Sequence, residues 1–90
     1  GSWKAFYAVD TGTTDSYVIT LSPALTAYIE GMPITFKANT ANTGVCTLNV
    51  NNLGEKTIKK NVNVDLVDND ILAGQIITVV YDGTNFQLIR

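Results

Sequence analysis

Histidine is absent from the 90 residues of this sequence. Histidine is the most frequent general base, the usual activator of a serine nucleophile and the commonest zinc ligand. Ser16 and Ser22 therefore have no evident activating partner, and a serine-based hydrolase is not expected. We predict that the chain is not an enzyme and that it holds no cofactor.

Cysteine occurs once, as Cys46. A single cysteine excludes an internal disulfide and a zinc site built from several thiolates. The residue lies in an alternating apolar run, Val45-Cys46-Thr47-Leu48, without histidine or clustered cations beside it. We therefore expect a small buried hydrophobic side chain and not a reactive thiol.

Basic residues are also few, with six Lys and Arg against eight Asp and Glu, which gives a formal net charge of −2. Nucleic-acid binding needs a basic face that neutralises several phosphates, so no nucleic-acid partner is expected. No apolar run is long enough for membrane insertion, and no signal peptide is recognisable. The leading Gly1-Ser2 is typical of a tag remnant, which predicts that residues 3–90 are a single domain cut from a longer protein.

The chain is rich in β-forming sequence. Val, Ile, Thr, Tyr and Phe alternate with polar residues, and turn residues interrupt them at short intervals. Strands are expected at residues 4–10, 16–21, 32–38, 45–51, 55–59, 62–66, 75–81 and 86–89. Residues 22–31 are the exception, where we expect one short helical turn at most, or a shaped loop. The pattern predicts an all-β domain, a small antiparallel β-sandwich or flattened barrel of about seven or eight strands.

Alternation also predicts which side chains fill the core: Val9, Ile19, Leu21, Ile34, Phe36, Leu48, Val50, Ile77, Val79 and Phe86. Residues 75–81 are apolar on both faces, which indicates a central strand covered on both sides. The Asp82-Gly83-Thr84-Asn85 segment after it is the strongest hairpin signal. A second hairpin is expected across Lys60-Asn61, because Asn tolerates a positive φ.

Acidic residues are the remaining source of chemistry. A glycosidase needs only two carboxylates, but most of the acids here adjoin Gly, Thr or Asn in expected turns, where Asp caps backbone groups. Asp65, Asp68 and Asp70 form the one acidic cluster of the sequence, and oxygen ligands suit Ca²⁺. Their spacing does not match an EF-hand loop, so we favour a plain turn and predict no metal site.

A loop rich in Asn and Thr spans residues 39–44 and offers polar side chains that could hydrogen-bond a glycan or a protein partner. Two aromatic residues are expected to be exposed and could stack on a sugar ring or pack against a neighbouring chain. The candidate contact residues are Trp3, Tyr28, Asn39, Asn42 and Thr43. The alternative is an ordinary loop with no ligand.

Four segments share a pattern that covers nearly the whole chain after its first residues. They are Tyr7-Ala8-Val9-Asp10-Thr11-Gly12; Leu21-Ser22-Pro23-Ala24 with Gly31-Met32-Pro33-Ile34-Thr35-Phe36-Lys37-Ala38; Ala41-Asn42-Thr43-Gly44 with Thr47-Leu48-Asn49-Val50-Asn51; and Asp70-Ile71-Leu72-Ala73-Gly74-Gln75 with Val80-Tyr81-Asp82-Gly83-Thr84-Asn85-Phe86-Gln87-Leu88. In combination they resemble a small β domain of phage and prophage tail-fibre and virion-associated proteins.

This resemblance implies a non-catalytic structural or adhesive module of a tail fibre or related virion appendage, assembled in the host cytoplasm. The implied partners are further copies in a homotrimer or other fibre and tail proteins, with a host surface glycan or protein as receptor. The resemblance supplies no catalytic or receptor-binding residue. The alternative is a stand-alone carbohydrate-binding module that recognises a cell-surface glycan.

An apolar surplus in the sequence also bears on assembly. The segment Ile76–Tyr81 is apolar on both faces, and Trp3, Phe6 and Tyr7 crowd the first expected strand. A core of this size is not expected to hide all of them, and an exposed apolar patch usually marks an interface. We therefore expect an interface patch, which the resemblance implies would face the other chains of a trimer. The competing explanation is that strand 76–81 is simply central, with each face covered by one side of a sandwich.

Overall fold

The computed structural model describes residues 7–89, which form eight β-strands and no helix. The strands are β1 (Tyr7–Val9), β2 (Ser16–Ile19), β3 (Pro33–Lys37), β4 (Thr47–Val50), β5 (Glu55–Lys60), β6 (Val64–Asp65), β7 (Ile76–Tyr81) and β8 (Phe86–Leu88). The prediction of an all-β domain with about seven or eight strands is confirmed. Among the described residues, no helix is long and apolar enough to cross a membrane. Residues 4–6 of the first expected strand lie outside the described part.

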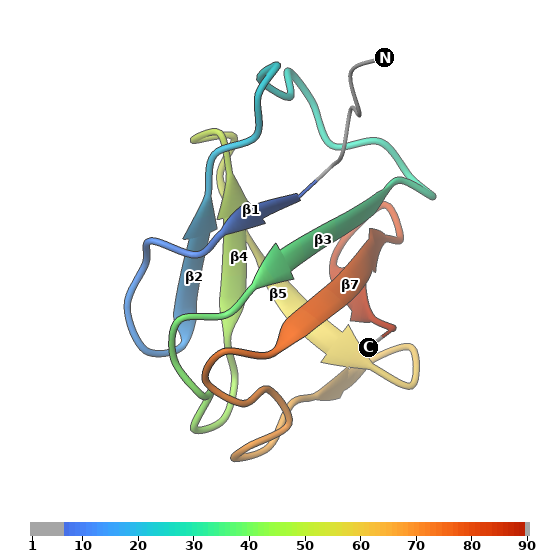
Figure 1. The fold of residues 1–90 in the computed structure, drawn as a ribbon. Helices are drawn as coiled ribbons and strands as arrows, with labels where there is room; N and C mark the ends of the chain where they lie inside the picture. The colour runs from blue at the N-terminus through green and yellow to red at the C-terminus, as the bar shows by residue number, and fades with distance from the viewer. Residues whose placement is uncertain (1–6, 90) are drawn as a thin grey trace.

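The strands form one sheet that curls into a nearly closed barrel (Figure 1). The order is β1-β3-β7-β8-β5-β4-β2, and β6 pairs with β5. Three pairings, β1 with β3, β2 with β4 and β5 with β8, are parallel. The expected antiparallel pairing does not hold for these three pairs, because the paired strands are distant in sequence and no hairpin turn sets their direction.

The first and last strands of the sheet, β1 and β2, come together at Asp10 and Gly12. Thr11 N–H donates to the Val18 carbonyl at 2.8 Å, just beyond the end of β1. The Asp10 carboxylate, only 3% exposed, accepts hydrogen bonds from the backbone N–H groups of Gly12 and Val18 on Oδ1 and of Asn39 on Oδ2. Strands β1 and β2 do not pair in a ladder, so the buried Asp10 side chain supplies hydrogen-bond acceptors to the backbone at this place. These bonds join the two ends of the nearly closed barrel.

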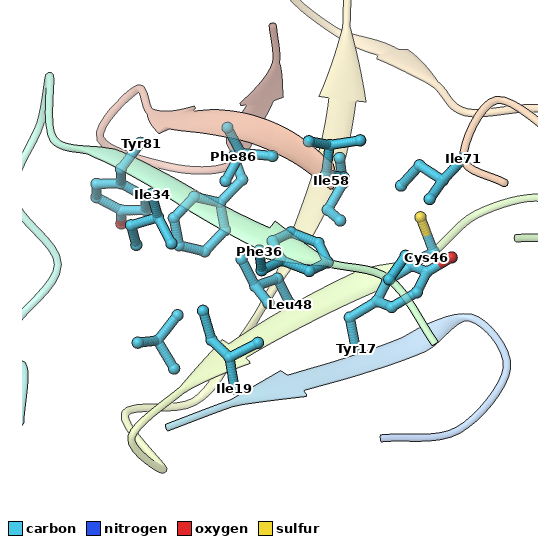
Figure 2. Close-up of a cluster of buried hydrophobic side chains, with 14 of the residues drawn as sticks. Tyr17, Ile19, Ile34, Phe36, Cys46, Leu48, Ile58, Ile71, Tyr81 and Phe86 are labelled. Atoms are coloured by element: carbon cyan, nitrogen blue, oxygen red, sulfur yellow. The ribbon is translucent and has the colours of Figure 1, made fainter. Parts of the chain in front are cut away.

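Inward-pointing side chains from every long strand fill the barrel (Figure 2). The predicted core residues found buried are Ile19, Leu21, Ile34, Phe36, Leu48, Val50, Ile77, Val79 and Phe86. Val9 was predicted wrongly, because it is 52% exposed; Ala8 is the β1 residue that points inward, in register with Phe36. Cys46 is buried as well, as its sequence context predicts, and the structure adds further core residues: Tyr17, Ala38, Ile58, Leu66, Ile71 and Tyr81.

Strand β7 lies between β3 and β8, so its predicted central position is confirmed. The prediction that both of its faces are covered is wrong, because Ile76 is 58% exposed while Ile77 and Val79 are buried. A barrel wall has one interior face only, and the alternate residues of β7 point outward.

Residues 22–31 form a shaped loop, which was one of the two expected outcomes. Asn51 holds the start of this loop, with its side-chain oxygen accepting from Leu25 N–H at 3.0 Å and its amide donating to the Leu21 carbonyl at 3.1 Å. Asn51 itself has a φ of 51°, which Asn adopts more readily than most residues.

Both expected hairpins are present. Asp82 N–H donates to the Asn85 carbonyl, and the Asp82 side chain accepts from the N–H groups of Thr84 and Asn85, so the β7–β8 turn is confirmed. In the β5–β6 hairpin Asn61 has the expected positive φ of 48°. That turn starts one residue later than predicted, because Lys60 still pairs with Val64.

Candidate functional site

The loop at residues 39–44 does not present all of its polar side chains to solvent. Asn42 is 0% exposed. Its side-chain amide donates to the carbonyls of Gly44 and Val67, both at 2.9 Å, and its oxygen accepts from Ile71 N–H at 2.8 Å. The expectation that Asn42 contacts a glycan is corrected, because the side chain joins two loops inside the protein and no ligand can reach it.

Asn39 and Thr43 of the same loop are exposed. The Thr43 backbone N–H donates to Asp15 Oδ1 at 2.7 Å, and the Thr43 hydroxyl donates to Asp15 Oδ2. The hydrogen bond from the hydroxyl, followed by that from the backbone N–H, lowers the pKa of Asp15 below its ordinary 3.8. Among the candidate residues that the structure describes, Asn39 and Thr43 are therefore the ones exposed at this end of the barrel.

Tyr28 is not the exposed aromatic residue that was expected. It is half-buried, and its ring packs 5.3 Å from that of Tyr81 and 5.2 Å from that of Phe86, measured between centroids. Its hydroxyl donates to the Gly54 carbonyl at 2.6 Å and accepts from Val50 N–H at 3.0 Å. Burial raises the pKa of Tyr28, and the residue serves to fix a loop over one end of the core.

The candidate contact residues do not converge on one site. Thr43 bonds to Asp15, which precedes β2, whereas Tyr28 bonds to Val50 at the end of β4. Because β2 and β4 run parallel, these contacts lie at opposite ends of the barrel (Figure 1). Trp3 lies outside the described residues.

Two of the three acids of the cluster, Asp65 and Asp70, form ion pairs. Lys59 Nζ lies 2.6 Å from Asp65, and Lys60 Nζ lies 2.8 Å from Asp70, which also accepts from Val67 N–H. Between residues 7 and 89, no three His, Cys, Asp or Glu side chains group closely enough to hold a metal ion. The cluster thus holds the β5–β6 hairpin and the turn that follows it.

Cys46 is the small buried hydrophobic residue that its sequence context predicts, with 1% of its surface exposed. Burial, followed by the charges of nearby aspartates, raises the pKa of its thiol to about 12. The thiolate is the nucleophilic form of cysteine, so this residue is inert at neutral pH.

A feature that sequence reasoning located only in part is an apolar region on the outside of the barrel. The apolar face, as it is called here, consists of the outward side chains of β1, β3, β7 and β8 together with Ile89, which directly follows β8. Its members are Tyr7, Val9, Pro33, Thr35, Lys37, Ile76, Thr78, Val80, Gln87 and Ile89. At its centre the hydroxyls of Thr35 and Thr78 bond to each other at 2.8 Å. The double-sided apolar pattern of β7 was the sequence signal for this face.

The outward side chains of β2, β4 and β5 contrast with the apolar face. They are Ser16, Val18, Thr47, Asn49, Glu55, Thr57 and Lys59, of which only Val18 is apolar. The outward residues of these three strands are thus more polar than the apolar face, but other exposed apolar residues lie outside it, among them Val62, Val64 and Val67 around β6. The role of the apolar face as a trimer-facing patch stays a prediction.

Comparison with known proteins adds no family. No protein-family model matches the chain, and no curated protein matches it with significant similarity. The four-segment resemblance therefore rests on the sequence, and the fold on the structure described above.

Proposed function

We propose that the chain is a non-catalytic structural or adhesive module of a phage tail fibre or related virion appendage, contributing to fibre assembly and host attachment. The proposal starts from the four-segment resemblance. The observation that supports it best is that polar side chains of these segments bond to the backbone of the same chain, Asp10 and Asn42 as buried residues and Asp82 in an exposed turn. Asp10 in the first segment, Asn42 in the third and Asp82 in the fourth each accept several backbone hydrogen bonds or join two loops.

Such a construction suits a load-bearing or spacing role. A barrel leaves few open sheet edges, and buried side chains that bond to several loops hold those loops in one conformation. Catalysis requires polar groups aimed at a reacting substrate. Here Asp10 and Asn42 are aimed at backbone groups of the same chain instead.

The proposed partners are further copies of the chain in a homotrimer, other fibre or tail proteins, and a host surface glycan or protein. The proposed location is the virion, after assembly in the host cytoplasm. These partners follow from the resemblance, and the module could be stem, spacer or tip.

The test is to find the chain in the virion. We expect an antibody raised against the 90-residue chain to label the tail or an appendage of purified virions in electron microscopy. The same antibody pre-incubated with excess chain serves as the control and should leave the virions unlabelled. Virions without label, from a lysate in which the antibody detects the chain elsewhere, would contradict the proposal.

The alternative, a stand-alone carbohydrate-binding module, has less support. Asn39 and Thr43 lie at one end of the barrel, and the half-buried Tyr28 lies at the other. We expect the isolated chain to give no robust signal on a glycan array. Robust binding that disappears in the double variant Asn39→Ala/Thr43→Ala would favour the alternative.

A further inference from the structure

Val62 follows Asn61 at the tip of the β5–β6 hairpin, and it suits this place in the fold poorly in two respects. Its φ is 76°, in the left-handed region that is unfavourable for a β-branched residue. Six non-glycine residues of the described part have a positive φ, and the other five are Asp or Asn, which tolerate it. The Val62 side chain is also 78% exposed, more than any other large apolar side chain that the structure describes. A valine here therefore serves neither the turn nor the core.

Surrounding groups hold the turn in this conformation. The Val62 carbonyl accepts a hydrogen bond from Gln87 Nε2 of β8 at 2.6 Å, and Lys60 and Val64 pair in register on the two strands of the hairpin. The β7–β8 turn of the same barrel has a glycine, Gly83, at its positive φ of 99°, which is the residue type that such a backbone conformation favours. An unfavourable backbone conformation that persists in a fold is a reason to look for a function.

Two further exposed valines follow Val62 in the chain. Val64 is 46% and Val67 is 57% exposed, and the three residues together are called here the hairpin valines. They lie within six consecutive residues, so no two of their Cα atoms are more than about 17 Å apart. In Figure 1 the yellow loop at the end of β5 stands out from the barrel wall on the side away from β2. Exposed apolar side chains gathered at one place on a surface indicate contact with a partner.

The charges of the hairpin indicate the kind of partner. Lys59 pairs with Asp65 at 2.6 Å and Lys60 with Asp70 at 2.8 Å, so these four charges cancel. Around a three-fold axis each side chain approaches its own copies, and an unpaired charge would meet a like charge there. The apolar face has such a charge at Lys37, which forms no ion pair among residues 7–89. The hairpin is therefore better suited than the apolar face to contact copies of itself.

We infer that the hairpin valines of three copies pack against one another around the axis of the homotrimer, with Val62 at the centre. The inference rests on the proposed function, because the homotrimer comes from the resemblance. The apolar area that Val62 buries in the trimer offsets the cost of its backbone conformation. Asp68, next to Val67, and Asp82, which shares Gln87 Nε2 with the Val62 carbonyl, form no ion pair among the described residues. They lie at the rim of the contact, where charged groups stay in water.

Light scattering of the 90-residue chain over a concentration series tests for the trimer. At high concentration the expected mass is three times the 9.7 kDa of one chain. A chain that stays monomeric up to about 1 mM, or one that forms a dimer, would overturn the inference. Labelled virions together with a monomeric chain would keep the proposed function and remove this interface, so the two failures are distinguishable.

Val62→Asn separates the cost of this residue to the fold from its benefit to the trimer, because asparagine accepts the positive φ and removes the apolar side chain. At concentrations where the chain is monomeric, the urea midpoint should rise, since the unfavourable backbone conformation is relieved. The concentration at which half of the chains are trimeric should rise about tenfold, since each of the three copies loses its contact. A lower urea midpoint, or unchanged association, would overturn the inference.

Two variants with the same replacement identify the surface that is used. Val67→Asn removes a hairpin valine that has no positive φ, so it should weaken association without raising the urea midpoint. Val9 is 52% exposed on β1, which β3, β7 and β8 separate from β5 in the sheet order. Val9→Asn should therefore leave association unchanged, and circular dichroism verifies that both variants fold. Equal weakening by Val67→Asn and Val9→Asn would overturn the inference.

Discussion

Gly12 lies where two segments of the backbone come too close together for any larger residue. A Cβ at this position would lie 2.0 Å from the Ser16 carbonyl oxygen and 2.9 Å from Val18 N, both backbone atoms that cannot easily move. Glycine is thus required by the close approach of two chain segments. Gly44 differs, because a Cβ there would meet nothing within 4 Å.

We therefore predict opposite outcomes for the same substitution at these two glycines. Gly12→Ala should lower the free energy of unfolding by about 2 kcal/mol or more, because Ser16 and Val18 must shift and the Asp10 hydrogen bonds shift with them. Gly44→Ala should change it by less than about 0.5 kcal/mol. Urea unfolding of both variants measures the difference, and similar values would refute the steric explanation.

At the scale of elements, local signals predicted the structure well. The β7–β8 turn was predictable because Asp82 and Gly83 favour a turn within four residues. The alternation in β3 and β4 identified the buried residues of both strands. The pairing of the strands was not predictable in the same way. Nothing local in the sequence of β1 says that it pairs in parallel with β3, more than twenty residues later.

The candidate site was predicted less well than the fold, for a related reason. Asn42 lies in a loop whose composition is typical of an exposed, adaptable contact surface. Its burial depends on Val67 and Ile71, which come to it from another part of the chain. The prediction that Tyr28 is exposed was wrong for the same reason, because its ring packs against Tyr81 and Phe86, which lie far from it in the sequence.

Two turns should make the stability of the barrel depend on pH. Hydrogen bonds from Thr43 hold the pKa of Asp15 below 3.8, and those from Asn85, then Gln87 and Thr84, do the same for Asp82. Both pKa values are lower in the folded than in the unfolded chain. The contribution of these carboxylates is therefore complete above pH 3.8 and is lost as the pH falls through the folded pKa values.

We expect the urea midpoint of the native chain to fall on acidification below about pH 4. In the double variant Asp15→Asn/Asp82→Asn the fall should be smaller, because two of the groups that take up protons on unfolding are gone. Other carboxylates titrate equally in both proteins, so the difference between the two curves is the quantity to compare. Parallel curves would show that these two turns do not carry the effect.

In the whole molecule, the polar residues that resemble candidate ligand contacts have a structural role, because they bond to distant parts of the same chain. Asp10 joins the two ends of the sheet order, and Asn42 joins the loop before β4 to the turn before β7. These contacts join the ends of the nearly closed barrel and two of its loops. The side chains left for partners then lie on the outside of the wall, where the apolar face is one of several exposed apolar regions.

The most direct test of this central claim is the free energy of unfolding of three alanine variants, measured with urea. Asp10→Ala should lower it by about 3 kcal/mol and Asn42→Ala by about 2 kcal/mol or more, because each leaves buried backbone N–H or carbonyl groups without a partner. Asn39→Ala, at an exposed position in the same loop as Asn42, should change it by less than about 0.5 kcal/mol. Losses of equal size in all three variants, or none in Asp10→Ala and Asn42→Ala, would contradict the account.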